Sequence, residues 1–500
     1  MDLVKNNRIF IGALCVSYVA LRLWRLTDAC LWFDEIFSIH AAEHSWGSIS
    51  WFVAQDLIHP PLFYALLKIW IGIGGESLPW LRLFSVVFSA AALIPFICLC
   101  KELKLKASTT LLALAFFVVN GSLIKYAQEA RMYSLLLCLS LFSLWLFTRF
   151  FFRGKNIWIL TAVNALIVYS HYFGWFIVLA EIMAILVLQR IKIRHVLIML
   201  AINIAAFVPW IFAIFKAVNS GSEVSQNIGW ISRPDVRSIF DFAFDLIEPF
   251  YYQTSSVESS TILYVTLPLL AIVIAAKLIY LVDWKQQDEH DRFWLLGIIS
   301  VVPFVIAFAI SWVSPFSVWG SRHLIIVFAP MMILSAIFLT EIANRTIRSG
   351  LIAAVILLFA VGAFQYSKAE STPQIWCAWE HLAHELPADR SQTVYVFEDL
   401  VAYHFWFATR SSENIKVFKV DGVPEMVEDK AYFLPRGFDE VQRIDPAGMR
   451  GDRFWVAFRD LKWNEKHPPI AGILYAGYKL ENKFELSSDG SKAFLVEADR

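Results

Sequence analysis

Repeated apolar runs dominate the first 370 residues and constrain the fold more than any other feature of the sequence. A transmembrane helix needs about 20 consecutive, mostly apolar residues, and eleven segments reach or approach this length. The sequence therefore predicts a polytopic α-helical membrane protein with about eleven transmembrane helices within residues 1–370. The approximate ranges of the runs are 9–27, 79–100, 107–124, 131–150, 157–170, 173–189, 196–215, 260–282, 294–312, 323–341 and 349–366.

The composition agrees with a membrane location. Hydrophobic residues make up 58% of the 500 residues and charged residues only 17%, whereas soluble proteins carry about a quarter charged residues. An ionisable side chain in hydrocarbon costs about 2.5 to 3.5 kcal/mol on insertion scales, so those that a membrane chain keeps are mostly functional or lie at span ends. The position of each charge is therefore more informative than the net charge of zero. We expect the lipid bilayer, and no nucleic acid, as a partner.

Lysine and arginine residues predict the orientation of the spans. These residues gather in the cytoplasmic loops of membrane proteins, and here they concentrate before the first span and in alternate loops after it. The N-terminus carries Lys5 and Arg8 but no small-residue cleavage site, so it is predicted to be cytoplasmic and to continue into a retained first span. With an odd number of spans, the C-terminal region is predicted to lie outside the cytoplasm.

From about residue 371 the composition becomes that of a soluble domain. Four stretches rich in β-branched and aromatic residues are typical of strands: "TVYVFEDL", "NIKVFKV", "RFWVAFRD" and "KAFLVEAD". Two more, "PQIWCAWEHLAHEL" and "DLVAYHFWFATR", have the pattern of helices. We therefore predict a small extracytoplasmic α/β domain over residues 371–500. The six cysteines of the chain show no pairing pattern, so no disulfide framework is predicted.

The loop after the first span, residues 28–78, holds the most informative polar residues. In "CLWFDEIFSIH", Asp34 and Glu35 stand between aromatic side chains. The pattern over 33–46 is that of a helix lying along the membrane surface, with aromatic rings at the headgroup level and polar side chains on one side. The two adjacent carboxylates would thus lie at the boundary between water and lipid.

Polar residues recur at the outer ends of the apolar segments that follow. They are Asp56 and His59 before a double proline, Lys125, Glu129 and Arg131 in "KYAQEARMYS", His171 and Tyr172 in "SHYFGW", and Arg322 and His323 in "WGSRHLIIVFAP". Each alone is also typical of an interfacial side chain that reaches toward water, and a glutamate in a first helical turn also complements the helix dipole. The predicted topology, however, puts all of these clusters at one depth on one face. A lipid-linked phosphate would lie at this depth.

One competing motif lies in the same first outer loop. "HAAEH", His40 to His44, matches the H-x-x-E-H pattern of inverted zinc peptidases, in which two histidines bind zinc and the glutamate, here Glu43, acts as the base. Short patterns recur by chance, and no downstream segment offers a convincing third ligand. A zinc peptidase is therefore the weaker interpretation.

The order of these motifs resembles that of the GT-C membrane glycosyltransferases. An Asp-Glu pair follows the first span, "HPPL" comes next, "EARMY" enters a later span, and a late span begins with an arginine. The similarity covers roughly residues 1–345 and is specifically to bacterial relatives of protein O-mannosyltransferases and of the lipid A aminoarabinose transferase. The resemblance implies a GT-C fold in the bacterial cytoplasmic (inner) membrane. It also implies transfer of a hexose or pentose from a polyprenyl-phosphate donor to a glycan, lipid or protein acceptor of the cell envelope.

The chain departs from this family in two places. Ile58-His59 stands where the aminoarabinose transferase has Glu-Lys before its prolines, so the metal and phosphate ligands of that enzyme do not carry over directly. The C-terminal domain is not the β-trefoil repeat of eukaryotic protein mannosyltransferases, so a protein acceptor does not carry over either.

The implied reaction assigns roles to the polar clusters. Displacement of a polyprenyl phosphate from an anomeric carbon needs a carboxylate near the acceptor hydroxyl and cations near the leaving phosphate. Asp34 is the candidate base, and Glu35 would orient the acceptor or a metal ion. Guanidinium groups bind phosphate in a planar fork. The remaining assignments are Arg131, Arg322, His59 and Lys125 to the donor phosphate, and Asp56, Glu129, His171 and Tyr172 to the positioning of the acceptor or of a metal ion.

The cofactor and two other function classes stay open at this point. A divalent cation is considered as a cofactor, with no metal ligands assigned. The chain could also be a lipid-linked-sugar flippase or other transporter, or a membrane-anchored binding or assembly protein. Transporters usually place polar residues and broken helices near the bilayer midplane, often in repeated halves. Here the charges gather at one face, which favours a leaflet-bound enzyme.

Overall fold

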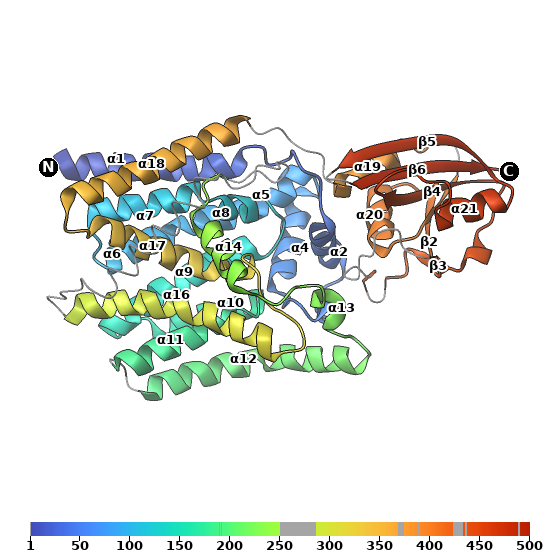
Figure 1. Ribbon diagram of the computed structural model, residues 1–500. Helices are drawn as coiled ribbons and strands as arrows, with labels where there is room; N and C mark the ends of the chain where they lie inside the picture. The colour runs from blue at the N-terminus through green and yellow to red at the C-terminus, as the bar shows by residue number, and fades with distance from the viewer. Residues whose placement is uncertain are drawn as a thin grey trace.

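The molecule has a bundle of helices at one end and a sheet with its own helices at the other (Figure 1). This computed structural model describes residues 2–500 except 190, 192, 251–286, 369–374, 388–390, 424–433, 436–437 and 489–490. The chain begins at the far end of the bundle and ends within the sheet part.

The bundle is built from helices of very different lengths. In chain order they are α1 (Asp2–Leu23), α2 (Phe33–Glu43), α3 (Ile49–Asp56), α4 (Leu62–Gly74), α5 (Leu78–Ala91), α6 (Leu93–Glu102), α7 (Ala107–Val119), α8 (Gly121–Ala127), α9 (Tyr133–Arg153), α10 (Ile157–Ser170), α11 (Gly174–Leu188), α12 (Ile193–Asn219), α13 (Ser225–Ile228), α14 (Val236–Ile247), α16 (Gln287–Val313), the 3₁₀ turn η1 (His323–Val327), α17 (Phe328–Thr340) and α18 (Arg345–Lys368).

Six helical segments of the described chain are long and apolar enough to cross a membrane, and shorter apolar helices accompany them. Every apolar run predicted within the described residues coincides with a helix or a pair of helices. The run at 260–282 lies outside the described residues. The predicted class of polytopic helical membrane protein is therefore confirmed in its outline, while the number of eleven spans stays a prediction. The six segments are Leu78–Glu102, Tyr133–Arg153, Arg194–Asn219, His290–Val313, His323–Thr340 and Arg345–Lys368.

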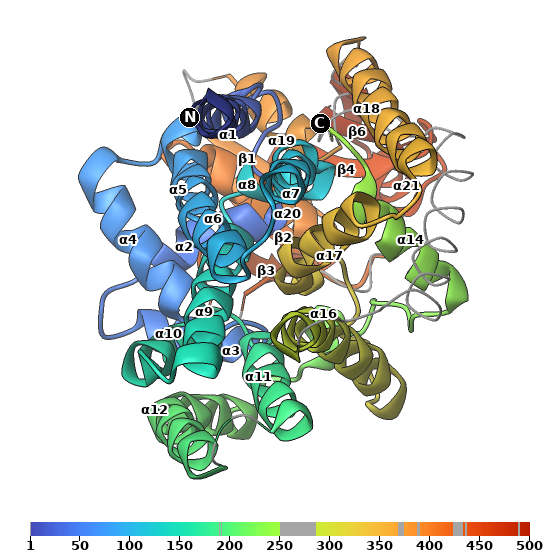
Figure 2. The same ribbon diagram turned by 90° about the vertical axis from the view of Figure 1, so that its left-hand side faces the viewer.

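Helix α9 lies deep within the bundle, with α5, α6, α10 and α11 packed around it (Figure 2). Its sequence is apolar on all sides, which is the pattern of a fully buried helix, and most of its side chains are buried. The helix ends at Gly154, which has the left-handed φ of +66° that glycine adopts without strain. Because neighbours hold α9, the residues just before Tyr133 have a defined place at its N-terminal end.

The C-terminal part is a six-stranded mixed sheet with the strand order β3-β2-β1-β4-β6-β5. Strands β3, β2, β1 and β4 are parallel, and β6 and β5 add an antiparallel hairpin beside β4. The elements are α19 (Ile375–His384), β1 (Gln392–Val396), α20 (Asp399–Thr409), β2 (Ile415–Val420), β3 (Gln442–Ile444), the 3₁₀ turn η2 (Pro446–Gly448), β4 (Arg453–Asp460), α21 (Pro468–Tyr475), β5 (Lys479–Ser488) and β6 (Ser491–Asp499). The predicted strands and helices are all present, and β3, β5 and α21 are additional.

Both faces of the sheet are buried, and successive side chains of a strand belong to different cores. Val394 and Val396 of β1 belong to the core that includes α19 and α20, whereas Tyr395 between them belongs to the core that includes Ile470 of α21. This period of two follows from strand geometry, in which successive side chains point to opposite faces. The face with α19 and α20 is the one turned toward the helical bundle (Figure 1).

Helix α2 differs from its prediction, because its apolar residues are buried against protein and do not form a lipid-facing surface. It ends at Glu43, and the side chains from Glu35 to Ala42 are buried. Phe37 packs against Phe52 and Tyr64 of the bundle, with ring centroids 5.4 and 5.9 Å away. On its other side α2 contacts α20 of the sheet part. Apolar residues on two faces thus serve two protein contacts in place of one lipid contact.

The predicted absence of a disulfide framework is wrong. Cys30, just before α2, forms a disulfide with Cys377 of α19. The two residues are 347 positions apart, and neither lies in a spacing pattern that could indicate the pair. The bond fixes the start of α2 to the sheet part. A second junction lies further along α2, where Arg410 at the end of α20 forms ion pairs with Glu43 and Glu76.

Candidate active site

Asp34 lies in the first turn of α2 and faces two arginines that come from distant segments. Its Oδ2 atom is 3.7 Å from Arg131 Nη2 and 3.6 Å from Arg322 Nη1. The Asp34 side chain is 26% exposed, so a solvent-borne or lipid-borne substrate can reach it. The structure thus brings together three of the residues that the sequence nominated, and gives the group a net positive charge.

Arg131 occupies the short turn between α8 and α9. Its Nη1 atom donates hydrogen bonds to the backbone oxygen of Asp34, at 2.9 Å, and to Ser38 Oγ, at 3.1 Å. The side chain is only 3% exposed, and its Nε–H has no hydrogen-bond partner within the protein. Arg131 therefore connects α9 to α2 and still has a free donor for a ligand.

Arg322 immediately precedes η1 and approaches Asp34 from a segment far along the chain. Its guanidinium carbon lies 5.8 Å from the centre of the Trp230 ring, and its side chain is 23% exposed. Arginine is always charged at physiological pH. Two guanidinium groups within 4 Å of one carboxylate oxygen form a site at which an anion can replace or join that carboxylate.

Three histidine rings lie in a row beside this group. The His59 and His171 ring centres are 5.2 Å apart, and so are those of His171 and His323. Burial, together with the nearby charge of Arg131, lowers the pKa of His59 well below its usual value. The same two causes, with Arg322 added, lower the pKa of His171 to about 3. The imidazoles of His59 and His171 are therefore neutral at physiological pH and can act as hydrogen-bond partners without adding charge.

Hydrogen bonds assign the tautomer of His171. Its Nδ1 atom accepts a hydrogen bond from the Phe173 N–H at 3.1 Å, so in the neutral ring the proton lies on Nε2. This Nε2–H is buried and has no partner within the protein. Both ring nitrogens of His59 are likewise buried without a hydrogen bond, although the Asp56 carboxylate lies 3.9 Å from Nδ1.

Two carboxylic acids near the arginines have raised pKa values. Burial raises the pKa of Asp56 to about 7, although the charge of Arg131 opposes the rise. Burial also raises the pKa of Glu129 to about 7, against the opposing charge of Lys125. Glu129 has one buried carboxylate oxygen without a hydrogen bond. Both groups can therefore hold or release a proton near neutral pH.

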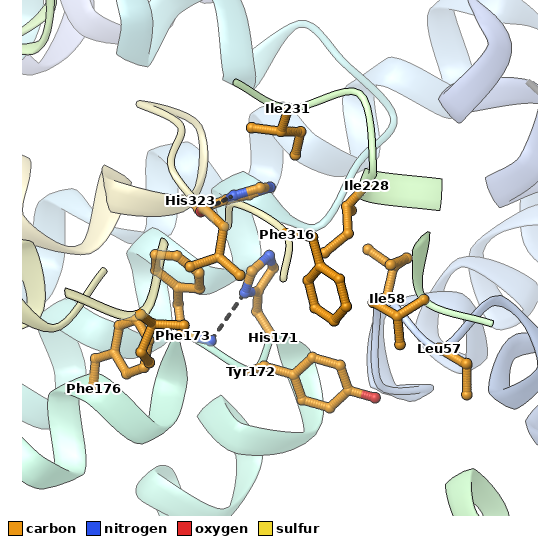
Figure 3. Close-up of a pocket in the computed structure, with 13 residues that line it drawn as sticks. Leu57, Ile58, His171, Tyr172, Phe173, Phe176, Ile228, Ile231, Phe316 and His323 are labelled. Carbon is orange, nitrogen blue, oxygen red and sulfur yellow. Dashed lines mark hydrogen bonds between the residues drawn. The ribbon is translucent and has the colours of Figure 1, made fainter. Parts of the chain in front are cut away.

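An apolar cavity of about 290 Å³ adjoins the histidines (Figure 3). His171, Tyr172 and His323 line one part of it, and Figure 3 shows the His171 ring held by the hydrogen bond from the Phe173 N–H. Leu57, which has an unusual left-handed φ of +61°, lies at another edge beside Ile58. The rest of the wall is apolar, with Phe173, Phe176, Val224, Ile228, Ile231, Ile310, Phe316 and Val318. The cavity suits a hydrocarbon group next to a charged one.

Comparison with known proteins identifies the fold. No family model and no curated protein sequence match the chain. A crystal structure of ArnT from Cupriavidus metallidurans bound to undecaprenyl phosphate matches with a TM-score of 0.57 and 9% identity, and the match covers 98% of this chain and 97% of that one. The apo structure of the same protein matches with a TM-score of 0.57 and 12% identity, over 99% and 98% of the two chains. ArnT is a GT-C glycosyltransferase. The chain has the GT-C fold.

One further solved structure is less similar to this chain. The Archaeoglobus fulgidus oligosaccharyltransferase, in complex with zinc and sulfate, matches with a TM-score of 0.46 and 11% identity, over 96% of this chain and 72% of that one. The GT-C fold is nevertheless the one that the sequence motifs implied, and the ArnT matches extend over the sheet part as well as the bundle.

Glu35 has a different setting from its neighbour in this GT-C chain. Its side chain is fully buried and forms an ion pair with Arg82, at 2.9 Å. The backbone N–H groups of Ala130 and Trp32 also donate to its carboxylate, at 2.8 and 3.3 Å. These contacts favour a structural role for Glu35 over the positioning of an acceptor or a metal ion.

Lys125 and Tyr172 border the group without contacting Asp34 in any described interaction. Lys125 lies near enough to Glu129 to affect its pKa. The Tyr172 hydroxyl accepts a hydrogen bond from Trp210 Nε1 at 3.1 Å, while the ring lines the cavity.

The sequence analysis did not nominate Arg82, the ion-pair partner of Glu35, although an arginine inside an apolar run is itself a signal of a functional or structural role.

The described residues do not offer a metal site. Among them, no three histidine, cysteine, aspartate or glutamate side chains are grouped so that they could hold a metal ion. The "HAAEH" residues instead serve the junction between the two parts: His40 Nδ1 is 2.9 Å from the Tyr403 hydroxyl, and Glu43 pairs with Arg410. This arrangement disfavours the zinc peptidase interpretation.

Proposed function

We propose that this protein is a membrane glycosyltransferase that takes a sugar from a polyprenyl-phosphate donor and transfers it to an acceptor outside the cytoplasm. The observation that carries the proposal is the position of Asp34 between Arg131 and Arg322, beside an apolar cavity. Such a site combines a proton acceptor, two phosphate ligands and a place for a lipid. ArnT, which shares the fold, has been crystallised with undecaprenyl phosphate.

The two arginines suit the phosphate of the donor. The phosphodiester of a polyprenyl-phosphate sugar carries one negative charge, and each guanidinium can bind it through two parallel hydrogen bonds. The neutral His59 and the Nε2–H of His171 can add hydrogen bonds, because both are buried without partners. Developing negative charge on the leaving phosphate is then stabilised by donors that are already in place.

The cavity suits the first isoprene units of the lipid. Its walls are formed mostly by isoleucine, valine and phenylalanine side chains, and burial of apolar surface contributes about 25 cal/mol per Å². His171 and His323 line the cavity and neighbour the arginines, so a donor could place its chain in the cavity and its phosphate at the guanidiniums.

Asp34 would take the proton from the acceptor. The acceptor oxygen forms a bond with the anomeric carbon, and the bond from that carbon to the phosphate oxygen breaks. The electron pair of the broken bond leaves with the polyprenyl phosphate, and the hydroxyl proton moves to an Asp34 carboxylate oxygen. A positioned base of this kind typically contributes about 10² to 10⁴ in rate. The proposed sugar is a hexose or a pentose, and the proposed acceptor is a glycan, a lipid or a protein.

The deciding experiment measures release of polyprenyl phosphate by the purified protein in detergent, supplied with polyprenyl-phosphate sugars and envelope acceptors. An enzyme should release polyprenyl phosphate. A flippase would instead move the labelled donor across a liposome membrane without cleaving it. Arg131→Lys should weaken donor use, because an ammonium cannot reproduce the planar fork. Arg237→Lys, at an exposed arginine of α14, is the matched control and should behave as the wild type. Donor that is transported but never cleaved would refute the proposal.

A further inference from the structure

A buried arginine of α5, Arg82, uses its whole guanidinium group inside the protein. The side chain is 2% exposed. Nε and Nη2 donate to the two carboxylate oxygens of Glu35, at 3.0 and 2.9 Å. The other three N–H bonds go to backbone oxygens that precede α2, those of Leu26 at 2.9 Å, Ala29 at 2.8 Å and Cys30 at 2.7 Å. All five donors of the guanidinium are therefore satisfied.

The Glu35 carboxylate, which Arg82 holds, also binds the turn that carries Arg131. The Oε1 atom of Glu35 also accepts the Ala130 N–H, at 2.8 Å, directly before Arg131 in the chain. One turn further along α5, Ser85 Oγ donates to the backbone oxygen of Arg131, at 3.3 Å. One face of α5 thus holds the segment before α2, the first turn of α2 and the turn before α9.

This face decides how Asp34 and Arg131 lie relative to each other. Asp34 directly precedes Glu35, whose carboxylate Arg82 holds, and Arg131 directly follows Ala130, whose N–H donates to that carboxylate. A buried ion pair adds little stability compared with apolar packing. Its geometry, however, is specific, because a planar fork and a carboxylate fit in one orientation.

We propose that Arg82 is a positioning residue for sugar transfer: acting through Glu35, it sets the place of Asp34 relative to Arg131. This inference rests on the proposed function for its activity readout and on the structure alone for its second readout. Arg82 itself touches no substrate. Replacement by lysine keeps the charge but removes the five-donor fork, so it should loosen the arrangement without removing the ion pair.

Arg22 offers a matched control. It is also fully buried, and Arg22→Lys removes the same fork from the same kind of environment. The guanidinium hydrogen bonds of Arg22 go to Tyr18, Ser89, Phe117 and Val118, so they hold α1 and not the first turn of α2.

The experiment compares Arg82→Lys with Arg22→Lys for turnover per folded protein and for amide hydrogen exchange over residues 30–36. We expect turnover to fall about 100-fold in Arg82→Lys, since a displacement of 1 Å can cost that much, and exchange over 30–36 to become faster. Arg22→Lys should keep near-native turnover and native exchange there. Equal turnover in the two variants, or unchanged exchange in Arg82→Lys, would overturn the inference.

Two further arms keep the test decisive. If Arg82→Lys does not fold, the double variant Glu35→Gln, Arg82→Gln removes both buried charges together and should fold, with the same low turnover and fast exchange. Native turnover in this variant would refute a positioning role. If the wild type releases no polyprenyl phosphate, the proposed function fails, whereas the exchange comparison still tests whether Arg82 fixes the first turn of α2.

Discussion

At the scale of single residues, the contact between Asp34 and its two arginines sets up a competition. In the protein alone, the Asp34 carboxylate is the anion that the guanidiniums face, at 3.7 and 3.6 Å. These distances exceed those of a tight N⁺–H···O⁻ hydrogen bond, which are about 2.7 to 2.9 Å. A donor phosphate can therefore take over the two cations at little cost and leave Asp34 free to contact the acceptor hydroxyl.

Asp34→Asn tests the base directly. Asparagine keeps the shape but cannot take the proton, so turnover should fall by roughly 10² to 10⁴ while donor affinity stays near native. Asp28→Asn is the control, because Asp28 lies in the same loop and pairs with Arg25 at 3.3 Å. Turnover and donor binding would be measured beside thermal stability. Normal turnover in a well-folded Asp34→Asn would remove Asp34 from the mechanism.

Glu129 should give donor binding a dependence on pH. With a pKa of about 7, its carboxyl is mostly protonated at pH 6 and ionised at pH 8, and the phosphodiester stays anionic throughout. Rising pH therefore places a negative charge near the bound phosphate and should weaken donor binding, by roughly 1 kcal/mol or about fivefold.

The variant Glu129→Gln should lose part of this dependence when donor affinity is measured from pH 6 to 8. Asp56, whose pKa is also about 7, would supply the remainder, so Asp56→Asn together with Glu129→Gln should give a nearly flat profile. A profile in the double variant as steep as in the wild type would show that other groups titrate.

At the scale of elements, the turn between α10 and α11 holds His171 and depends on a glycine. A Cβ atom on Gly174 would lie 2.7 and 2.8 Å from the backbone carbon and oxygen of Ile167, so α10 and α11 could not keep their approach. Gly174→Ala should destabilise the protein by about 1 to 3 kcal/mol, the usual cost of overpacking, and should lower donor affinity because His171 shifts with the turn.

Thermal unfolding and donor binding would check this expectation against Gly297→Ala. A Cβ atom on Gly297, within α16, meets nothing within 4 Å, and alanine favours helix by about 1 kcal/mol, so that variant should be unchanged or slightly more stable. Similar melting temperatures for the two variants would contradict the tight contact at Gly174.

The sequence predicts some elements well and others poorly, for physical reasons that differ. The strands around Val394 and Val456 are buried on both faces and consist of β-branched and aromatic residues, so local composition indicates them. Helix α2 is amphipathic, and the pattern alone cannot show whether its apolar residues meet lipid or protein. Packing against α20, a contact between residues far apart in sequence, decides this.

The candidate site shows the same division. Asp34, Arg131 and Arg322 could be nominated because charge is rare in an apolar chain and because the predicted topology places them on one face. The sequence could not predict that Asp34 is partly exposed whereas Glu35 is buried in an ion pair. This difference depends on Arg82, which is 47 residues away from Glu35. The roles of all the candidate side chains, Asp34, Arg131 and Arg322 included, stay predictions.

At the scale of the whole molecule, the bond between Cys30 and Cys377 should matter for stability. A disulfide that closes a long loop typically stabilises a protein by about 2 to 4 kcal/mol. The double variant Cys30→Ser, Cys377→Ser should therefore melt at a lower temperature than the wild type. Cys98→Ser, at a half-buried free cysteine, is the control and should melt near the wild-type temperature.

A reducing agent provides the second half of that measurement. Reductant should lower the melting temperature of the wild type and leave the double serine variant unaffected. Equal sensitivity of the two proteins to reductant would mean that the bond between α19 and the start of α2 contributes nothing to stability.

The same bond also has a consequence for the passage of the chain through the bilayer. Two cysteines that are joined must lie in one compartment, and disulfides persist in oxidising compartments, which is the kind of compartment that the predicted orientation gives residues 30 and 377. The chain must then cross the bilayer an even number of times between them. Of the eleven apolar runs predicted from the sequence, one precedes Cys30 and ten follow it before Cys377. A crossing number of even parity is thus a condition that any experimental topology map of this protein has to meet.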